Sequence, residues 1–236
     1  MTTPENTSDD SRHTRGSLLR LAGLAAAAGG GAGWKIADSA AAGPLAVSKG
    51  LVTCVLAPEL TEGPFYVPDE KLRRDITDNK PGVPLLLALT VVDASTCKKI
   101  RNAAVDIWHC DALGAYSAEI AGNPGTNFLR GVQRTNAKGV ATFQTIYPGW
   151  YPGRAVHVHV KVHVRGNVVH TGQLFFPAAA SNAVYRRKPY SSHGTAPDTP
   201  NAGDAIFRNG GSKGLLQLVK SGAGYKGTIA MGVSVA

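Results

Sequence analysis

The chain of 236 residues has few cysteines, few charged residues and no long basic run. Its three cysteines include no C-x-x-C pair, which disfavours a tetrahedral cysteine–histidine zinc site. Charged residues make up only 17% of the chain against 43% hydrophobic residues, as is typical of a globular protein. The formal net charge is +9, yet the densest basic group is only residues 186–188 and no aromatic stacking platform accompanies it. We therefore expect no nucleic-acid partner, although a basic surface would attract anionic aromatic acids or acidic polymers.

The first 42 residues have the pattern of an export signal. An apolar run of small residues at 21–33 follows three arginines and precedes an A-x-A cleavage site at Ala40–Ala42; the arginines are Arg12, Arg15 and Arg20. This run is too short and too rich in glycine for a comfortable membrane span. The membrane is therefore a partner only if the segment is retained as an N-terminal anchor.

The export route has two candidates. Residues 14–19 resemble a twin-arginine signal in which Gly16 stands at the second arginine, so either the Sec route or a degenerate twin-arginine route is expected. We expect an exported protein, secreted or at the cell surface, with its signal at 1–42 and a single domain at 43–236.

Export permits a disulfide, and an odd cysteine count leaves one thiol over. We expect Cys54 to pair with Cys97, because both flank the first strand region. Cys110 instead ends a different strand beside candidate site residues.

The many short valine-rich runs, with 28 glycines and 14 prolines between them, predict an all-β domain. We expect strands at residues 85–92, 104–109, 140–146, 156–164, 168–176 and 228–235. No long amphipathic helix is evident, so the predicted fold is an immunoglobulin/prealbumin-like β-sandwich with long loop excursions. Residues 177–227 are rich in Ser, Gly, Asn and Pro and form the longest excursion, which is typical of a functional loop or a lid.

The most informative stretch is residues 147–164, YPGWYPGRAVHVHVKVHV. Its second half alternates valine with polar residues, and this period of two predicts a strand with one face buried against a sheet. The other face carries His157 and His159 as next neighbours, and two imidazoles presented in this way can hold one metal ion. Tyr151 and Arg154 lie just upstream on a Pro/Gly-rich loop. The alternation alone fits an ordinary solvated strand face equally well.

Several segments, in their order along the chain, resemble the intradiol ring-cleavage dioxygenases, which open catechols between the two hydroxylated carbons. They are VDIWHCDALGAY at 105–116, FQTIYPGWYP at 143–152, RAVHVH at 154–159, GQLFF at 172–176 and TEGPFY at 61–66. The similarity spans about residues 50–236. The short loop between Tyr151 and Arg154, together with the export signal, looks more like the secreted branch of this family than its cytosolic members.

The resemblance implies a non-haem Fe(III) centre with four protein ligands, namely Tyr116, Tyr151, His157 and His159. Tyr151 and His157 would be axial, while Tyr147 matches a position that is not a ligand in the family. Phenolate is a hard anionic ligand that favours ferric over ferrous iron, and the imidazoles complete the set without adding charge. Because a free tyrosine has a pKa near ~10, only a strong Lewis acid would keep two of them deprotonated at neutral pH.

The same resemblance implies an oxidoreductase of aromatic compound catabolism that takes a small aromatic diol and both atoms of O₂. The product would be a cis,cis-muconate-type acid, and no organic cofactor would be needed. Tyr151 would leave the metal with a substrate proton, Arg154 would stabilise the carbanion-like substrate, and Gln173 would orient the ring or the anhydride. The oligomeric state and the particular catechol stay open.

Other chemical groups have simpler interpretations. Gly63, Pro64 and Tyr66 either wall the pocket or form a turn that packs on the sandwich, and Trp108 is expected in the core. The polar residues Asp198, Asn201 and Asp204 lack EF-hand-like spacing and indicate a polar loop. The expected non-ligand histidines are His109, His163, His170 and His193.

The alternative to a dioxygenase is an exported β-sandwich that binds copper or zinc through His157, His159 and His163. Such a protein would be non-enzymatic, serving storage or adhesion, or would resemble a copper/zinc superoxide dismutase. Both versions predict a metal site without tyrosinate.

Overall fold

The computed structural model of the chain describes residues 54, 56–68, 71–118 and 121–235. The predicted export signal at 1–42 lies outside the described residues, and the predicted division into signal and single domain stays a prediction. Within the described part of the chain, no helix has both the length and the apolar character needed to cross a membrane.

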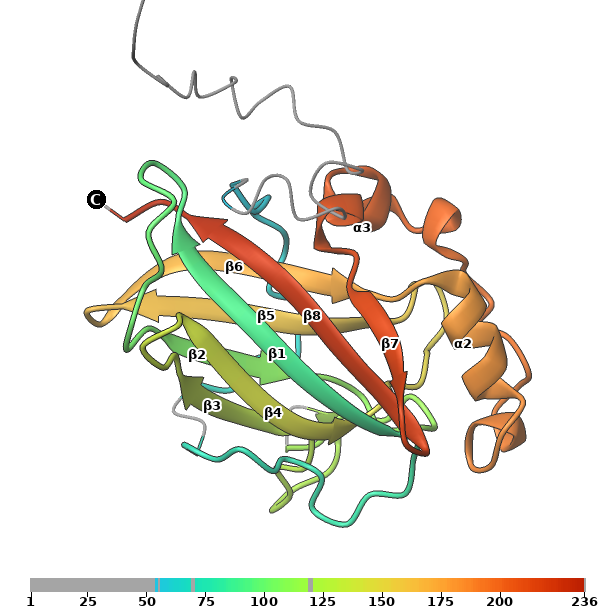
Figure 1. Ribbon diagram of the computed structural model, residues 1–236. Coiled ribbons are helices and arrows are strands. Elements are labelled where there is room, and N and C mark those ends of the chain that lie inside the picture. The colour runs from blue at the N-terminus through green and yellow to red at the C-terminus, as the bar shows by residue number, and fades with distance from the viewer. Residues whose placement is uncertain (1–53, 55, 69–70, 119–120, 236) are drawn as a thin grey trace, which may run out of the picture. The chain divides into compact units, whose positions relative to one another are not determined.

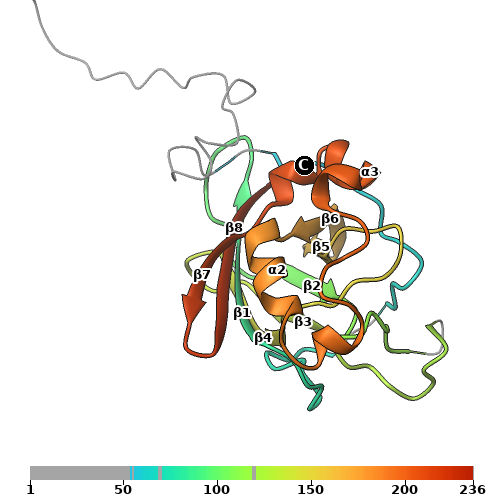
Figure 2. The same ribbon diagram turned by 90° about the vertical axis from the view of Figure 1, so that its right-hand side faces the viewer.

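Two four-stranded sheets form the domain, as the sequence predicted for an all-β sandwich. One sheet has the order β4 (Val140–Ile146), β1 (Pro84–Asp93), β8 (Gly224–Val233) and β7 (Gln217–Ser221). The other has the order β3 (Arg130–Arg134), β2 (Ala104–Trp108), β5 (His157–Val164) and β6 (Asn167–Phe175). Figures 1 and 2 show the two sheets as separate layers.

The core lies between the inner faces of the two sheets. In β1, which lies between β4 and β8, the leucines at alternate positions 85, 87 and 89 are 0–2% exposed, so the inner face of this strand is buried. From the other sheet, Val158, Val160 and Val162 of β5 are all 0% exposed. Burying such aliphatic side chains contributes roughly 1.5–3 kcal/mol each, which fixes the register of both strands and hence the direction of their polar neighbours.

The polar face of β5 is buried as well, which the alternation did not predict. His157, His159 and Lys161 are 3%, 1% and 7% exposed, and only the last two residues of the strand are partly open to solvent. The interpretation of this face as solvated is therefore wrong. Other parts of the chain cover it, and β5 contributes to two interiors, one on each side of its sheet.

Two strands were missed by sequence reasoning, and both lie at sheet edges. β3 reads RGVQR and β7 reads QLVKS, so neither has the apolar run of a buried strand. An edge strand needs only one hydrogen-bonded neighbour and tolerates polar side chains on its open side. The last predicted strand, 228–235, corresponds to β8, which begins earlier, at Gly224, and ends at Val233.

The excursion at 177–227 contains short helices before it returns to the sheet as β7. They are α2 (Ala178–Tyr185), η3 (Tyr190–Ser192), η4 (Asn201–Gly203), α3 (Ala205–Arg208) and η5 (Gly211–Gly214). Both α-helices lie beyond the end of β6 (Figure 1). Buried residues of α2, among them Val184 and Tyr185, extend the main core, so the first part of the excursion is structural.

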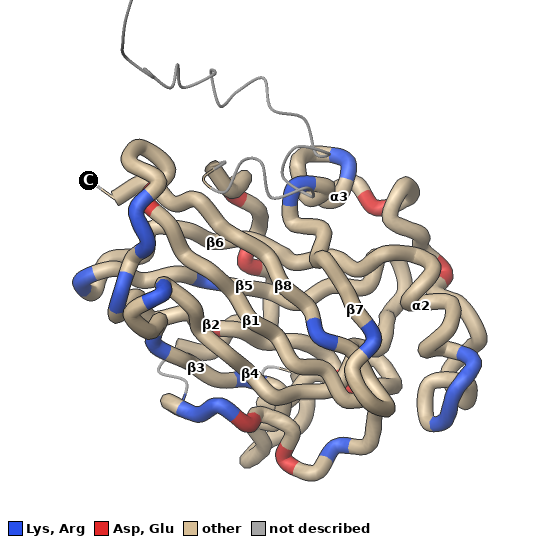
Figure 3. The backbone as a smooth tube through the Cα atoms, viewed as in Figure 1, with Lys and Arg blue, Asp and Glu red and all other residues tan. Residues whose placement is uncertain are grey.

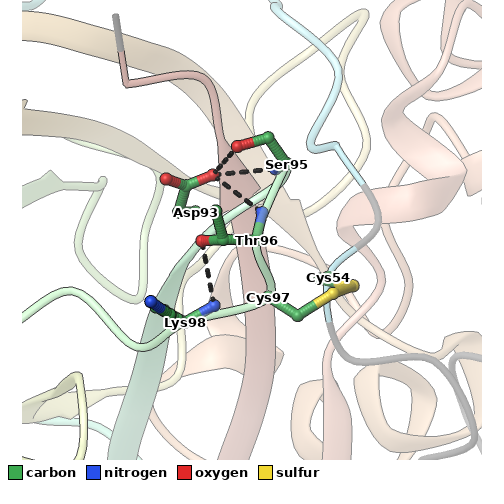
Figure 4. Close-up of a disulfide and its surroundings, with 6 residues drawn as sticks. All are labelled: Cys54, Asp93, Ser95, Thr96, Cys97 and Lys98. Carbon is green, nitrogen blue, oxygen red and sulfur yellow. Dashed lines mark hydrogen bonds between the residues drawn. A yellow bond between two sulfur atoms is a disulfide. The ribbon is translucent and has the colours of Figure 1, made fainter.

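The predicted disulfide between Cys54 and Cys97 is present (Figure 4). It ties the start of the described chain to the turn after β1, where Asp93 accepts hydrogen bonds from Ser95 and from the backbone of Thr96. The third cysteine, Cys110, is a buried free thiol, and burial raises its pKa. Basic residues lie on separate loops and strand ends rather than in one run (Figure 3).

Candidate metal centre

The two histidines of β5 point to the same side of their sheet, as alternation along a strand requires. Their Nε2 atoms are 3.1 Å apart, and the Tyr151 hydroxyl oxygen lies 3.1 Å from His157 Nε2. Two imidazole nitrogens bound to one metal at roughly 2.0–2.1 Å are about 3 Å apart when they subtend a right angle. The spacing of these three donor atoms therefore fits shared coordination of a single ion.

The two tyrosine-bearing loops are locked together by close backbone contacts. A Cβ atom on Gly114 would lie 2.3 Å from the carbonyl oxygen of Trp150, and one on Gly149 would lie 2.4 Å from that of Asp111. Gly149 also donates its backbone N–H to Asp111. Since no side chain fits at either glycine, these contacts fix the loop before Tyr116 against the loop before Tyr151.

Tyr116 completes the cluster from the third segment. Its ring lies 5.9 Å from the Tyr151 ring and 6.2 Å from the His159 ring, measured between centroids. Phe65 stacks on it at 4.4 Å. The Tyr116 side chain is buried and its hydroxyl has no hydrogen-bond partner of good geometry among the described residues. A buried polar atom left in this way costs about 1–3 kcal/mol, and a bound cation would satisfy it.

The tautomer of His157 follows from its neighbour. Its Nδ1 atom lies 2.6 Å from the carbonyl oxygen of Ala155, which can only accept a hydrogen bond. Nδ1 therefore carries the proton, and Nε2 turns a lone pair toward the cluster. Histidines that bind a metal through one ring nitrogen commonly donate the N–H of the other to a carbonyl oxygen in this way.

Burial shifts the pKa values of the cluster so that its side chains are neutral unless a cation is bound. It lowers the pKa of His157 to about 3 and that of His159 well below its usual value, so both imidazoles are neutral. Burial likewise raises the pKa of Tyr116 well above its usual value and raises that of Tyr151, although Arg154 opposes the second shift. The phenols therefore stay protonated near neutral pH unless a strong Lewis acid binds them.

The donor set consists of phenols and imidazoles, and no described group of three His, Cys, Asp or Glu residues could hold a metal ion. The three-histidine copper or zinc site of the alternative hypothesis is thus not formed, since His163 does not join His157 and His159. Two neutral imidazoles and two tyrosines that can become phenolates suit a hard trivalent cation, so these residues fit ferric iron.

Arg154 and Gln173 also lie at this site, as the sequence suggested. An Arg154 Nη2 hydrogen is donated to Gln173 Oε1, and Gln173 faces His159 across the β5–β6 pairing. Arg154 Nε donates to Asp204 Oδ2 at 2.9 Å. Asp204 was predicted to belong to a polar loop, but its side chain is only 1% exposed. Asp204 therefore lies in a loop, as predicted, but its carboxylate is buried at the site.

Residues 61–66 cover the polar face of β5. Lys161 is paired with Glu62, and Gln173 Nε2 donates to the carbonyl oxygen of Thr61 at 2.9 Å. Arg130 donates to the carbonyl oxygen of Phe65 at 2.5 Å. The segment is thus held at three points, so it is a turn that packs on the sandwich and at the same time a wall of the site.

Two aromatic residues require comment. Trp108 is buried as predicted, but it stacks on His159 with centroids 4.9 Å apart and an interplanar angle of 5°, so it supports a candidate ligand directly. The competing phenol Tyr147 lies in the main core and its hydroxyl is bonded to Ser181, away from the cluster. The pairing of Trp108 with His159 across β2 and β5 could have been found from strand register, had the register been known.

A large cavity of about 1580 Å³ lies elsewhere, along the loops that join β1 to β2 and β5 to β6. None of the six predicted site residues lines it. Its lining includes His163, Lys98, Arg101 and Arg165. We place the chemistry at the tyrosine–histidine cluster, because buried donor atoms converge there.

Fold and donor set together describe a β-sandwich with a candidate mixed tyrosine–histidine metal centre. Comparison with known proteins supports the fold and identifies the family. The family model described as "Dioxygenase" matches residues 61–181. An intradiol ring-cleavage dioxygenase structure from Tetranychus urticae is 33% identical, with a TM-score of 0.72, and covers 77% of this chain and 95% of its own.

Two curated relatives match shorter stretches. Catechol 1,2-dioxygenase 2 of Acinetobacter lwoffii is 33% identical over 99 residues, which is 40% of this chain and 35% of the relative. An intradiol ring-cleavage dioxygenase of Aspergillus niger is 33% identical over 93 residues, which is 38% of this chain and 28% of the relative. The matched stretches span about a third of these curated relatives.

The chain belongs to the intradiol ring-cleavage dioxygenase family. This confirms the predicted family, the all-β sandwich and the class of enzyme, an oxidoreductase of the dioxygenase type. The roles of the individual site residues stay predictions that the geometry makes possible.

Proposed function

We propose that the chain is an exported, non-haem Fe(III)-dependent dioxygenase that cleaves a catechol-type aromatic with O₂ to a cis,cis-muconate-type product. The observation that carries the proposal is the convergence of Tyr151 Oη, His157 Nε2 and His159 Nε2 through contacts of 3.1 Å, beside the buried hydroxyl of Tyr116. The family of the chain and the names of its relatives support the same reaction class.

The proposed role of each site residue follows from its position. Tyr116, Tyr151, His157 and His159 would hold the ion, which would bind the two substrate oxygens and make the ring reactive toward O₂. Of these four residues only Tyr151 is partly exposed, so its hydroxyl is the one placed to take a proton from an entering diol. Trp108 and residues 61–66 exclude water from the far side of the histidines.

Arg154 supplies fixed positive charge at the mouth of the cluster. Its side chain is 18% exposed, and its Nε and Nη2 groups are already directed by Asp204 and Gln173. A guanidinium held in this way stabilises negative charge that develops on the aromatic ring during the reaction. Because it is fixed before the substrate arrives, little reorganisation is needed.

Export is part of the proposal and rests on different observations. The N-terminal pattern of arginines, apolar run and A-x-A site supports it, as does the Cys54–Cys97 disulfide, since disulfides persist mainly in oxidising compartments. Expression of the full chain followed by N-terminal sequencing of the extracellular fraction tests this point. A mature chain that begins near residue 43 is expected, and uncleaved protein confined to the cytosol would contradict export.

Colour and oxygen uptake test the chemistry. Iron-loaded protein should be red-brown from tyrosinate-to-Fe(III) charge transfer, and a panel of catechols should show oxygen uptake with an intradiol product. Tyr116→Phe and Tyr151→Phe should each bleach or shift the band. Tyr147→Phe is the matched control, because that phenol lies in the core and should leave the band in place. Colourless iron-loaded protein, or extradiol products, would contradict the proposal.

A further inference from the structure

We propose that Asp204 is the positioning residue for Arg154, and that the excursion at 177–227 contributes to the site through this carboxylate. Asp204 would hold the guanidinium in the orientation from which it faces the bound aromatic ring. The inference rests on the proposed function, because it concerns how Arg154 acts in that reaction. It assigns a specific role at the site to the segment whose composition predicts a functional loop or a lid.

The two carboxylate oxygen atoms of Asp204 accept hydrogen bonds from different groups. Oδ1 accepts the backbone N–H groups of Ile206 and Phe207 and so caps the first turn of α3. Oδ2 accepts Arg154 Nε at 2.9 Å and the backbone N–H of Ala155 at 2.8 Å. Burial alone would raise the pKa of Asp204, but these hydrogen bonds and the guanidinium hold the pKa below its usual value, so the carboxylate is charged.

A helix cap alone does not account for a carboxylate here. α3 has only four residues, and an uncharged Asn or Ser would cap it as well. The negative charge of Asp204 is needed to pair with the Arg154 guanidinium, because a partly buried guanidinium without an anionic partner would destabilise the fold. The side chain of Asp204 is 1% exposed, so its attraction for Arg154 is weakly screened by solvent.

The segment that carries Asp204 is itself fixed to the sandwich. Asn201 Nδ2 donates to the carbonyl oxygen of Phe176 at 3.0 Å, just beyond β6. Phe207 packs edge-on against Phe175 with ring centroids 5.1 Å apart. Asp204 is therefore a firm anchor, since contacts on both sides of it hold the segment against the end of β6.

Arg154 is held from two directions by this arrangement. Its Nε group donates to Asp204 and its Nη2 group donates to Gln173. The plane of the guanidinium is thus set by partners on two of its three nitrogens.

The test is Asp204→Asn in the iron-loaded full chain, with Asp198→Asn as the matched control. Asp198 lies on the same excursion and accepts the backbone N–H of Gly153 at 3.2 Å, but it does not touch Arg154. Loss of a charged hydrogen-bond partner should lower kcat roughly ten- to a hundredfold. KM should change less than about threefold, since the ligands that bind the diol stay in place. The charge-transfer band should keep its position, and Asp198→Asn should match the parent protein.

A double-mutant cycle separates positioning from a structural role. In an Arg154→Gln background, Asp204→Asn should have almost no further effect on kcat, because its target is gone. Full additivity of the two changes would overturn the inference, and so would an unchanged kcat in the single variant or a lost band in folded Asp204→Asn.

If Asp204→Asn does not fold, Arg154→Lys carries the test. Lysine keeps the charge, but its donors all lie on one nitrogen, so it has no guanidinium plane that Asp204 and Gln173 could orient. A kcat as low as that of Arg154→Gln supports positioning, whereas activity close to the parent shows that charge alone suffices and overturns it. Failure of the proposed function is distinct, because the parent protein itself would then lack colour and ring cleavage.

Discussion

The contact between Gly63 and His159 allows a quantitative test of how the covering segment shapes the metal centre. A Cβ atom on Gly63 would lie 2.9 Å from His159 Cε1 and 3.5 Å from Nε2, the candidate donor atom. Carbon atoms in good contact are about 3.5–4.0 Å apart, so the ring or the segment must move by about 0.6 Å. The ring has little freedom, because it is stacked on Trp108.

Gly63→Ala should therefore destabilise the protein in two ways. The residue has φ +76°, where a side chain costs about 1–2 kcal/mol. Overpacking against the imidazole adds about 1–3 kcal/mol. Together these lower the free energy of unfolding by about 2–5 kcal/mol, measured by urea denaturation. The displaced His159 should also weaken iron binding and reduce the charge-transfer absorbance at a fixed iron concentration.

Gly166→Ala isolates the backbone cost. Gly166 has φ +85°, and nothing lies within 4 Å of the position of an added Cβ, so only the first contribution applies. It should lose about 1–2 kcal/mol and keep full colour. If Gly63→Ala matched Gly166→Ala in both stability and iron affinity, residues 61–66 would not constrain His159 and the reasoning would be refuted.

Three further predictions concern stability. His109 is fully buried, and burial lowers its pKa from 6.5 to about 4, so between these values the unfolded chain binds a proton that the folded chain does not. The free energy of unfolding should therefore fall by about 3 kcal/mol as the pH drops from 6.5 to 4, and His109→Gln should flatten that part of the urea-midpoint profile relative to the parent. The Cys54–Cys97 disulfide closes a loop of 43 residues, so Cys97→Ser should cost about 2–4 kcal/mol, and an unchanged urea midpoint would contradict a structural bridge. Leu89→Ala should cost about 2–5 kcal/mol, because Leu89 is fully buried in the central strand β1, and a loss below 1 kcal/mol would show that the two sheets are loosely packed there.

The sequence predicted those parts of the fold whose pattern is local. Alternation gave β5 within one residue and also gave β2, and a continuous apolar run gave β1. The turns that precede them helped to place β4 and β6, with small shifts at the ends. The edge strands β3 and β7 were not predicted, because the sequence of a polar strand with only one neighbour resembles that of a loop. A period of two also cannot tell a solvated polar face from one that another segment covers, so the burial of Lys161 was not foreseen.

In the candidate site, too, the residues with a local pattern could be predicted from that pattern and those brought in from distant segments could not. His157 and His159 follow from two-residue spacing, but Tyr116 and Tyr151 come from separate loops, and only the family resemblance placed them with the histidines. Asp204 could not be predicted, since it lies 50 residues from Arg154 in a segment without periodicity. Its role depends on how a long excursion folds back over the end of β6, which is decided by packing rather than by local pattern.

The geometry of Gln173 narrows what that residue can do. Arg154 can only donate hydrogen bonds and the carbonyl oxygen of Thr61 can only accept them, so Oε1 must face the arginine and Nε2 must face residue 61. The side chain is 2% exposed and both ends of its amide are engaged, which leaves one N–H and one lone pair for any substrate contact. Gln173 thus joins the covering segment to the Arg154–Asp204 pair in one chain of hydrogen bonds. A change at this amide would release the wall of the site and the guanidinium together, so a kinetic defect in a Gln173 variant could not by itself be assigned to a lost contact with the ring.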